Sequence, residues 1–189
     1  AKAPSAARVV YDHFGGAASF PLVSVELMRA VDQADSADYN LAEILEPQGW
    51  VLLNFLMDPR TGLGRFHDFG VSNYELMMQL IDYCLAHPVD EVLQLADVAE
   101  RVALYHEQSA LFSAQLERCT TVMGSVAVVD LRGEEIIYAG NRFMVYALYP
   151  QASVSVHVLW GRQKLNTVLA VGKSILNRSN PVDIGTLML

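Results

Sequence analysis

The chain has 189 residues, of which 52% are hydrophobic and 18% are charged, a composition typical of a folded globular protein rather than a disordered one. That length can bury one sizeable core or two small ones. The formal net charge of -8 argues against a broad binding surface for duplex DNA, although a single phosphate can still bind a local basic pocket.

Helices are predicted at the start of the chain. Ser5 is a candidate N-cap for a helix over residues 5–14, and the glycine pair at 15–16 ends it. A second helix is predicted to begin at Pro21 and to run through Val31. The segment "NLAEILEPQGWVLLNFL" keeps a helical spacing of its apolar residues, so helix is expected to continue there.

The middle of the chain carries the strongest helical signals. The segment "SNYELMMQLIDYCLAH" begins with Ser72 as a candidate N-cap, and Glu75 stands at the capping-box position. A long amphipathic stretch, rich in good helix formers, follows from Val89 to about Arg118. The first two thirds of the chain are therefore predicted to be helical.

The pattern changes after Cys119. The segment "TVMGSVAVVDLRGEEIIYAG" alternates apolar residues around "RGEE", which predicts a strand hairpin, and "RFMVYALYP" fits either helix or strand. Two further strands are predicted in "ASVSVHVLWG" and "NTVLAVGKS", joined by a turn at "RQK". A last helix is expected after Pro181, within "NPVDIGTLML".

These elements predict an α/β protein, which in this stretch of chain is α+β: helices first, then a small mixed sheet of at least four strands. We expect a domain boundary where the helical spacing gives way to alternation, so that residues 1–118 form a helical part and residues 119–189 a separate module.

Cysteine spacing and hydropathy indicate the compartment. Cys84 and Cys119 are far apart, without the close cysteine or histidine neighbours of a zinc site or a disulfide framework. No apolar run reaches the roughly 18 residues that a membrane span needs, and the first residues lack the apolar core of a signal peptide. We expect a cytoplasmic protein with no membrane partner.

Three aspartates stand at intervals of three in "MRAVDQADSADYN": Asp32, Asp35 and Asp38. On a helix they point to roughly the same side and repel one another unless a positive charge lies among them. A bound cation would explain the spacing. A solvated helix end explains it equally simply, because exposed carboxylates often stand close together.

A second polar stretch, "FLMDPRTGLGRFHDF", threads ionisable groups between Pro59 and two glycines. Such a loop could surround a ligand, but turns formed by aspartate side chains at "DPRTG" account for most of it without any function. The polar residues concerned are Asp58, Arg60, Thr61, Arg65, His67 and Asp68.

A third polar stretch, "GKSILNRSNP", lies where a strand is predicted to pass into a helix. Backbone N–H groups at such a junction, with a Lys, an Arg and hydroxyls beside them, favour a bound phosphate. The spacing is not that of a P-loop, because the required earlier glycine is missing. The candidate phosphate-binding residues are Lys173, Ser174, Asn177, Arg178 and Ser179, and Asn141 and Arg142 of "YAGNRF" form a further polar pair that could face a ligand. An alternative is that Arg178 pairs with Asp183, without any ligand.

The segments "SAARVVYDHFG", "AVDQADSADY", "GWVLLNFLMDPRTGLGRF", "IIYAGNRFMVYALYP", "VHVLWG" and "GKSILNRS", in this order, make the chain resemble the DHH phosphoesterase superfamily in its exopolyphosphatase-related branch. Related branches are oligoribonucleases that also act on 3'-phosphoadenosine 5'-phosphate. The resemblance covers nearly the whole chain. It implies the C-terminal tail of a DHH α/β domain, linker helices, and then a DHH-associated domain that binds the substrate.

The resemblance also implies two Mn²⁺ or Mg²⁺ ions as cofactors. Asp35, followed by Ser36, matches the family's fourth metal-binding aspartate, with Asp58 and then Asp32 in reserve. The family's D-x-D, D-H-H and G-G-G-H motifs do not occur in this sequence. We therefore expect a fragment of a longer enzyme that is inactive by itself.

The function implied is a metal-dependent phosphoesterase that hydrolyses phosphodiester or phosphoanhydride bonds of a small anionic substrate. A short single-stranded oligonucleotide or a nucleoside bisphosphate is the expected partner, and duplex DNA is not. Two alternatives stay open: an exopolyphosphatase or pyrophosphatase, and a non-catalytic module that binds phosphate or nucleotide. A homodimer is compatible with these features.

Overall fold

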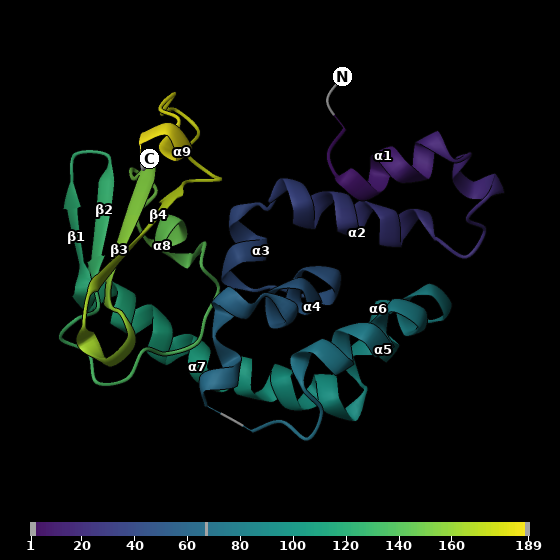
Figure 1. The fold of residues 1–189 in the computed structure, drawn as a ribbon, viewed down its shortest axis with the longest axis horizontal. Helices are drawn as coiled ribbons and strands as arrows, with labels where there is room; N and C mark the ends of the chain where they lie inside the picture. The colour runs from purple at the N-terminus through teal and green to yellow at the C-terminus, as the bar shows by residue number, and fades with distance from the viewer. Residues whose placement is uncertain (1–2, 67, 188–189) are drawn as a thin grey trace. The chain divides into compact units, whose positions relative to one another are not determined.

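The computed structural model describes residues 3–66 and 68–187 (Figure 1). Helices come first along the chain, and four strands follow. The longer helices of the first part are α1 (Ala6–His13), α2 (Val25–Ser36), α4 (Gly49–Met57), α5 (Asn73–Ala86) and α7 (Ala96–Cys119), with the five-residue helices α3 (Leu41–Leu45) and α6 (Val89–Leu93) between them. None of the described helices is long and apolar enough to cross a membrane.

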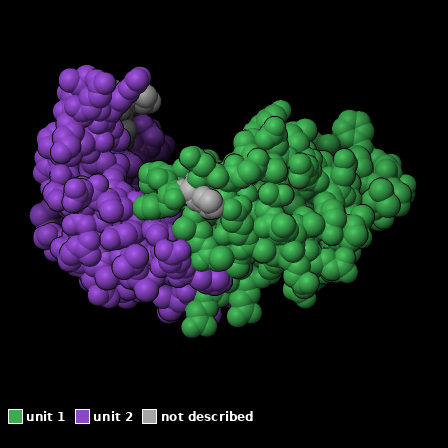
Figure 2. Space-filling model, turned by 90° about the horizontal axis from the view of Figure 1, so that it is seen from below, with its two compact units in different colours: residues 1–39, 46–105 green, residues 40–45, 106–189 purple. Residues whose placement is uncertain are grey.

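The chain divides into two compact units, which Figure 2 colours separately. The first contains residues 1–39 and 46–105, and the second contains residues 40–45 and 106–189. This division falls inside α7. The domain boundary drawn from the sequence at Cys119 follows the change from helix to strand and stays a prediction.

Serine caps fix the helix starts near the N-terminus. Ser5 Oγ accepts the N–H of Arg8, as expected for the N-cap of α1. The second helix begins later than predicted from Pro21, because the Ser24 hydroxyl accepts the N–H of Leu27 and starts α2 at Val25. That helix runs on to Ser36 and ends where Ala37 takes a left-handed φ of 50°.

Two stretches predicted as continuous helix are each broken in two. Pro47 and the left-handed Gly49 (φ 52°) separate α3 from α4. The expected helix from Val89 to Arg118 breaks after α6, and the carbonyl of Leu95 accepts the first N–H bonds of α7. The predicted capping box of α5 is confirmed, because Ser72 and Glu75 each bond to the backbone of the other.

A buried arginine fastens the segment before α5 to α7. Arg101 is completely buried, and its guanidinium donates to the carbonyls of Asp97 and Val71 (both 2.7 Å) and to Asn73 Oδ1 (3.0 Å). Its Cζ lies 3.9 Å from the ring centroid of Phe69. Neutral hydrogen-bond acceptors and an aromatic ring face therefore surround this buried guanidinium, which lies in the first unit.

The four strands form one mixed sheet in the order β1 (Thr120–Met123), β2 (Val126–Asp130), β3 (Val154–Trp160) and β4 (Thr167–Lys173). The outer pairs are antiparallel, and β2 pairs with β3 in parallel. Ala127 on β2 lies opposite Ser155 on β3, and both side chains are buried. The residues that alternate with them, such as Val128 and Val156, are only partly buried, so the sheet has one inner face. The predicted mixed fold with four strands is confirmed.

The turn of the first hairpin was predicted in the wrong place. The chain turns at Gly124, which takes a left-handed φ of 60°, and no strand forms at "EEIIYAG". Gln115 of α7 gives the reason. Its Nε2 donates to the carbonyl of Ile136 (2.7 Å) and its Oε1 accepts the N–H of Tyr138 (3.0 Å). A side-chain amide thus replaces the backbone partners that a neighbouring strand would supply.

Glu134 completes this attachment to α7. It accepts hydrogen bonds from the Arg118 guanidinium and from Gln115 Nε2 (2.6 Å). These bonds, the one from Arg118 first, lower the pKa of Glu134 from 4.5 to about 2. Because the pKa is lower in the folded state, Glu134 stabilises the fold above about pH 4.5, and that contribution is lost as the pH falls toward 2.

We predict that Glu134→Gln makes the free energy of unfolding less dependent on pH. The free energy of unfolding of the wild-type protein should exceed that of the variant most at pH 7. This difference should shrink between pH 4.5 and pH 2, as measured by urea unfolding at several pH values. Glu135→Gln, at an exposed neighbouring position, is the control. A difference that stays constant with pH would show that the Arg118 pair contributes no titration-linked stability.

Candidate functional site

Asp32 is engaged in a salt bridge within the first unit. Arg8 donates to its Oδ2 through Nε (3.0 Å) and Nη2 (2.6 Å), and the Ser5 hydroxyl donates to Oδ1 (2.7 Å). The bond from Arg8 is the main cause of the lowered pKa of Asp32. This carboxylate therefore joins α1 to α2, and a metal would have to compete with a cation already in place.

Asp35 lies one turn further along α2 and is exposed. The C-terminal end of a helix carries the negative end of its dipole, which disfavours a carboxylate there by about 0.3–1 kcal/mol. A nearby cation would offset that cost. However, the described residues contain no group of three or more His, Cys, Asp or Glu side chains placed to hold a metal. Asp35 could supply one ligand, and the described part of the chain does not build a complete metal centre.

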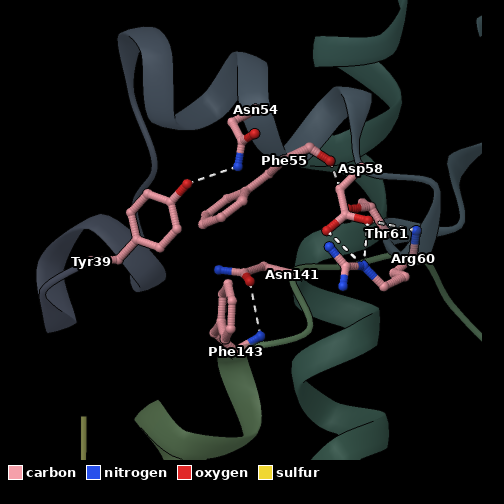
Figure 3. A network of polar contacts seen from close by, with 8 residues as sticks. All are labelled: Tyr39, Asn54, Phe55, Asp58, Arg60, Thr61, Asn141 and Phe143. Atoms are coloured by element: carbon pink, nitrogen blue, oxygen red, sulfur yellow. Dashed lines mark hydrogen bonds and ion pairs between the residues drawn. The ribbon is translucent and has the colours of Figure 1, made fainter. Parts of the chain in front are cut away.

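Asp58 shapes its own loop. Its Oδ1 accepts hydrogen bonds from the backbone N–H (2.9 Å) and from Nε (2.8 Å) of Arg60 (Figure 3). These bonds fix the 3₁₀ turn Pro59–Thr61, which follows α4. The buried Thr61 hydroxyl donates to the carbonyl of Phe55 (2.6 Å). These bonds are the turn chemistry that the sequence offered as the alternative to a ligand loop. His67 of this stretch lies outside the described residues.

Asn141 also has a structural environment. It is buried, its Oδ1 accepts the N–H of Phe143 (2.9 Å), and its Nδ2 donates to the carbonyl of Ile44 at the end of α3 (3.3 Å). Arg142 beside it is exposed, with its Cζ 4.2 Å from the ring centroid of Phe143. Arg142 is therefore the member of this pair that solvent or a ligand can reach.

The remaining candidates are Lys173, the last residue of β4, and residues of the loop 174–183 between β4 and α9 (Ile184–Leu187). The loop is fastened to the start of β3. The N–H of Ser174 donates to the carbonyl of Ser153 (2.9 Å), and Asn180 Nδ2 lies 3.4 Å from the Ser153 hydroxyl. Asn177 Nδ2 donates to the carbonyls of residues 150 and 151. The loop therefore has a defined path although it contains no regular structure.

Among the five candidate residues of this segment, three have exposed side chains: Lys173, Arg178 and Ser179. Lys173 Nζ donates to the carbonyl of Val182 (2.9 Å), and Arg178 Nε donates to the carbonyl of Ile175 (3.0 Å). Two cations and a hydroxyl are thus presented on one short anchored segment, which is a suitable arrangement for a phosphate.

The helix end that was predicted to assist this site does not do so. Helix α9 begins at Ile184, later than the expected start near Pro181, and has only four residues. Asp183 already accepts the N–H groups of Gly185 (2.9 Å) and Thr186 (3.3 Å) at its start. The Asp183 carboxylate therefore caps α9, and a pairing of Arg178 with Asp183 stays a prediction.

Sequence reasoning missed the buried support beneath the loop. The hydroxyls of Tyr146, on α8 (Met144–Leu148), and of Ser155 lie 2.7 Å apart, and both residues are buried. Gly172 passes so close that a Cβ on it would lie 2.9 Å from the Tyr146 oxygen. The signal was in "ASVSV", where Ser153 and Ser155 alternate with valines and so share the inner face of the strand.

Comparison with known proteins gives one informative result. No family model matches the chain, and no curated protein matches it. Among solved structures, the chain is similar to a pGpG-specific phosphodiesterase, PggH from Vibrio cholerae, with 55% sequence identity and a TM-score of 0.88. The match covers 99% of this chain and 63% of that protein, so the chain spans less than two thirds of the length of the relative.

We predict that Gly172→Ala destabilises the second unit by about 1–3 kcal/mol, because the new methyl group overlaps the Tyr146 hydroxyl. Urea unfolding measures this cost. Gly133→Ala is the matched control, since a Cβ there meets nothing within 4 Å. In a Tyr146→Phe background the cost should fall. Equal losses of stability in the two alanine variants would show that the Tyr146 hydroxyl does not hinder a Cβ at residue 172.

Proposed function

We propose that this chain is part of a metal-dependent phosphodiesterase of the DHH superfamily that hydrolyses a short guanine dinucleotide of the pGpG type. The observation that carries the proposal is the 55% identity, over 99% of the chain, to a protein described as a pGpG-specific phosphodiesterase. The motifs that resemble the DHH superfamily support the same class. The proposal includes the domain boundary that was predicted from the sequence. Residues 1–118 are the tail of the catalytic domain and its linker, and residues 119–189 are the substrate-binding domain.

The loop after β4 is assigned the role of holding the substrate phosphate. A dinucleotide with a 5'-phosphate carries several negative charges in a small volume, which suits the exposed Lys173 and Arg178 better than it suits the acidic surface elsewhere. The planar guanidinium can donate two parallel hydrogen bonds to one phosphate. Ser179 and Arg142, both exposed, are the further candidates for contact with the substrate.

Two Mn²⁺ or Mg²⁺ ions, when bound, would supply activation of the attacking water and neutralise charge on the phosphoryl oxygens. Asp35 is our candidate to contribute one oxygen ligand, with Asp58 and Asp32 as weaker candidates because both already accept bonds from arginines. The remaining ligands must come from residues outside the described part of this chain. The second candidate function is a module that binds the dinucleotide without hydrolysing it.

We predict that Arg178→Ala weakens pGpG binding to this chain by roughly 30-fold at low salt, corresponding to about 2 kcal/mol for one charge-assisted contact. Isothermal titration calorimetry measures the change. Arg162→Ala removes an exposed arginine from the other end of the strand pair and should have little effect. Unchanged affinity in Arg178→Ala, or preference for polyphosphate over pGpG, would refute the proposed substrate site.

A second prediction concerns the metal in the intact enzyme that the proposal requires. Asp35→Asn should lower Mn²⁺-dependent turnover by more than roughly 100-fold. Loss of a residue that only hydrogen-bonds to a metal ligand typically lowers activity by roughly 10–100-fold. The melting temperature without metal should stay within a few degrees, because Asp35 is exposed. Asp38→Asn is the control. If Asp58→Asn abolishes turnover and Asp35→Asn does not, the ligand is Asp58.

A further inference from the structure

We propose that Ser174 and Asn177 do not hold the substrate but position the residues that do, Arg178 and Ser179. This inference rests on the proposed function of the loop. It assigns different roles to residues that the sequence pattern groups together. Ser174 is buried and Asn177 is half-buried with its amide bonded to the backbone, whereas Arg178 and Ser179 are exposed.

Ser174 is 5% exposed, so a substrate phosphate cannot reach its hydroxyl without unfolding the loop. That oxygen accepts the N–H groups of Leu176 (3.2 Å) and Asn177 (2.8 Å), and the residue's own N–H donates to the carbonyl of Ser153. The hydroxyl therefore closes the first turn after β4, in the manner of a serine at the start of a turn.

Asn177 uses both ends of its amide in the same way. Its Nδ2 donates to the carbonyls of Pro150 (3.4 Å) and Gln151 (3.2 Å), and its Oδ1 accepts the N–H of Ser179 (3.2 Å). An asparagine amide has two N–H donors and one carbonyl, so a phosphate contact would require it to give up bonds that fix the loop.

Arg178 lies between Asn177 and Ser179 in the chain, and the N–H of Ser179 donates to Asn177 Oδ1. The backbone at Arg178 is thereby held in a short turn while its side chain stays exposed. A loop that is already ordered loses less conformational freedom when the ligand binds, which strengthens binding without any new contact. Asn177 should therefore act on the affinity through Arg178.

A double-mutant cycle tests this coupling. Asn177→Ala, Arg178→Ala and the double variant are compared in pGpG binding by calorimetry at low salt. We expect Asn177→Ala to weaken binding about tenfold in the wild-type background but less than about twofold when Arg178 is already alanine, because the two residues act through one contact. Asn166→Ala, which removes an exposed amide from the turn between β3 and β4, is the matched control.

Additive effects would overturn the inference, since they would mean that Asn177 contacts the substrate itself. A lower melting temperature with unchanged pGpG affinity in the Asn177→Ala single variant would also overturn it, because the residue would then be structural only.

Hydrogen exchange without ligand provides an independent readout. Amides of residues 174–179 should exchange at least about tenfold faster in Asn177→Ala, while those of β3 and β4 stay unchanged. Unchanged protection of the loop would contradict the positioning role. If Arg178→Ala itself leaves pGpG binding unaltered, the proposed function fails, and hydrogen exchange alone still decides whether Asn177 orders the loop.

Discussion

The hydrogen bond between the Tyr146 and Ser155 hydroxyls, buried against Gly172, is the contact on which the candidate substrate loop depends. It brings α8, β3 and the last residues of β4 together at one point. Burying two hydroxyls is costly unless each has a partner, so the pair specifies one arrangement and excludes others. Gly172 lies against this pair, one residue before the end of β4, and the anchored loop follows directly.

The loop shows how a flexible segment becomes a defined site without helix or strand. Ser174, Asn177 and Asn180 attach it to the residues just before β3, using backbone carbonyls and one hydroxyl as partners. Short polar side chains are suited to this because they compete with the backbone for its own hydrogen bonds. The side chains of Lys173 and Arg178 are exposed, and each donates one hydrogen bond to a carbonyl of the same segment.

The aspartate run illustrates a different division of roles. Asp32 and Asp35 lie in the last turns of α2, where the helix dipole disfavours carboxylates, and Asp38 lies beyond the end of the helix; Arg8 pairs with Asp32. Asp35 stays exposed at the same end. A single exposed carboxylate can supply one metal ligand but does not form a metal centre.

The sequence by itself determined the features that depend on neighbours within a few residues. The Ser5 cap, the box formed by Ser72 and Glu75, and the strands around "RQK" were predicted correctly because their bonding partners lie within one turn or one hairpin. The turn chemistry of Asp58 was likewise visible in "DPRTG". The order of the motifs implied a phosphoesterase, and the chain is similar to a solved phosphodiesterase.

Only the tertiary structure decided the features whose partners are distant in the chain. Gln115 replaced a predicted strand by bonding to Ile136 and Tyr138, and no local pattern in "EEIIYAG" reveals that amide. The hydrogen bonds of Ser174 and Asn177 likewise go to carbonyls more than twenty residues earlier. A polar side chain looks the same in a sequence whether it is bonded to the backbone or left for a ligand, and only folding brings the competing partner into reach.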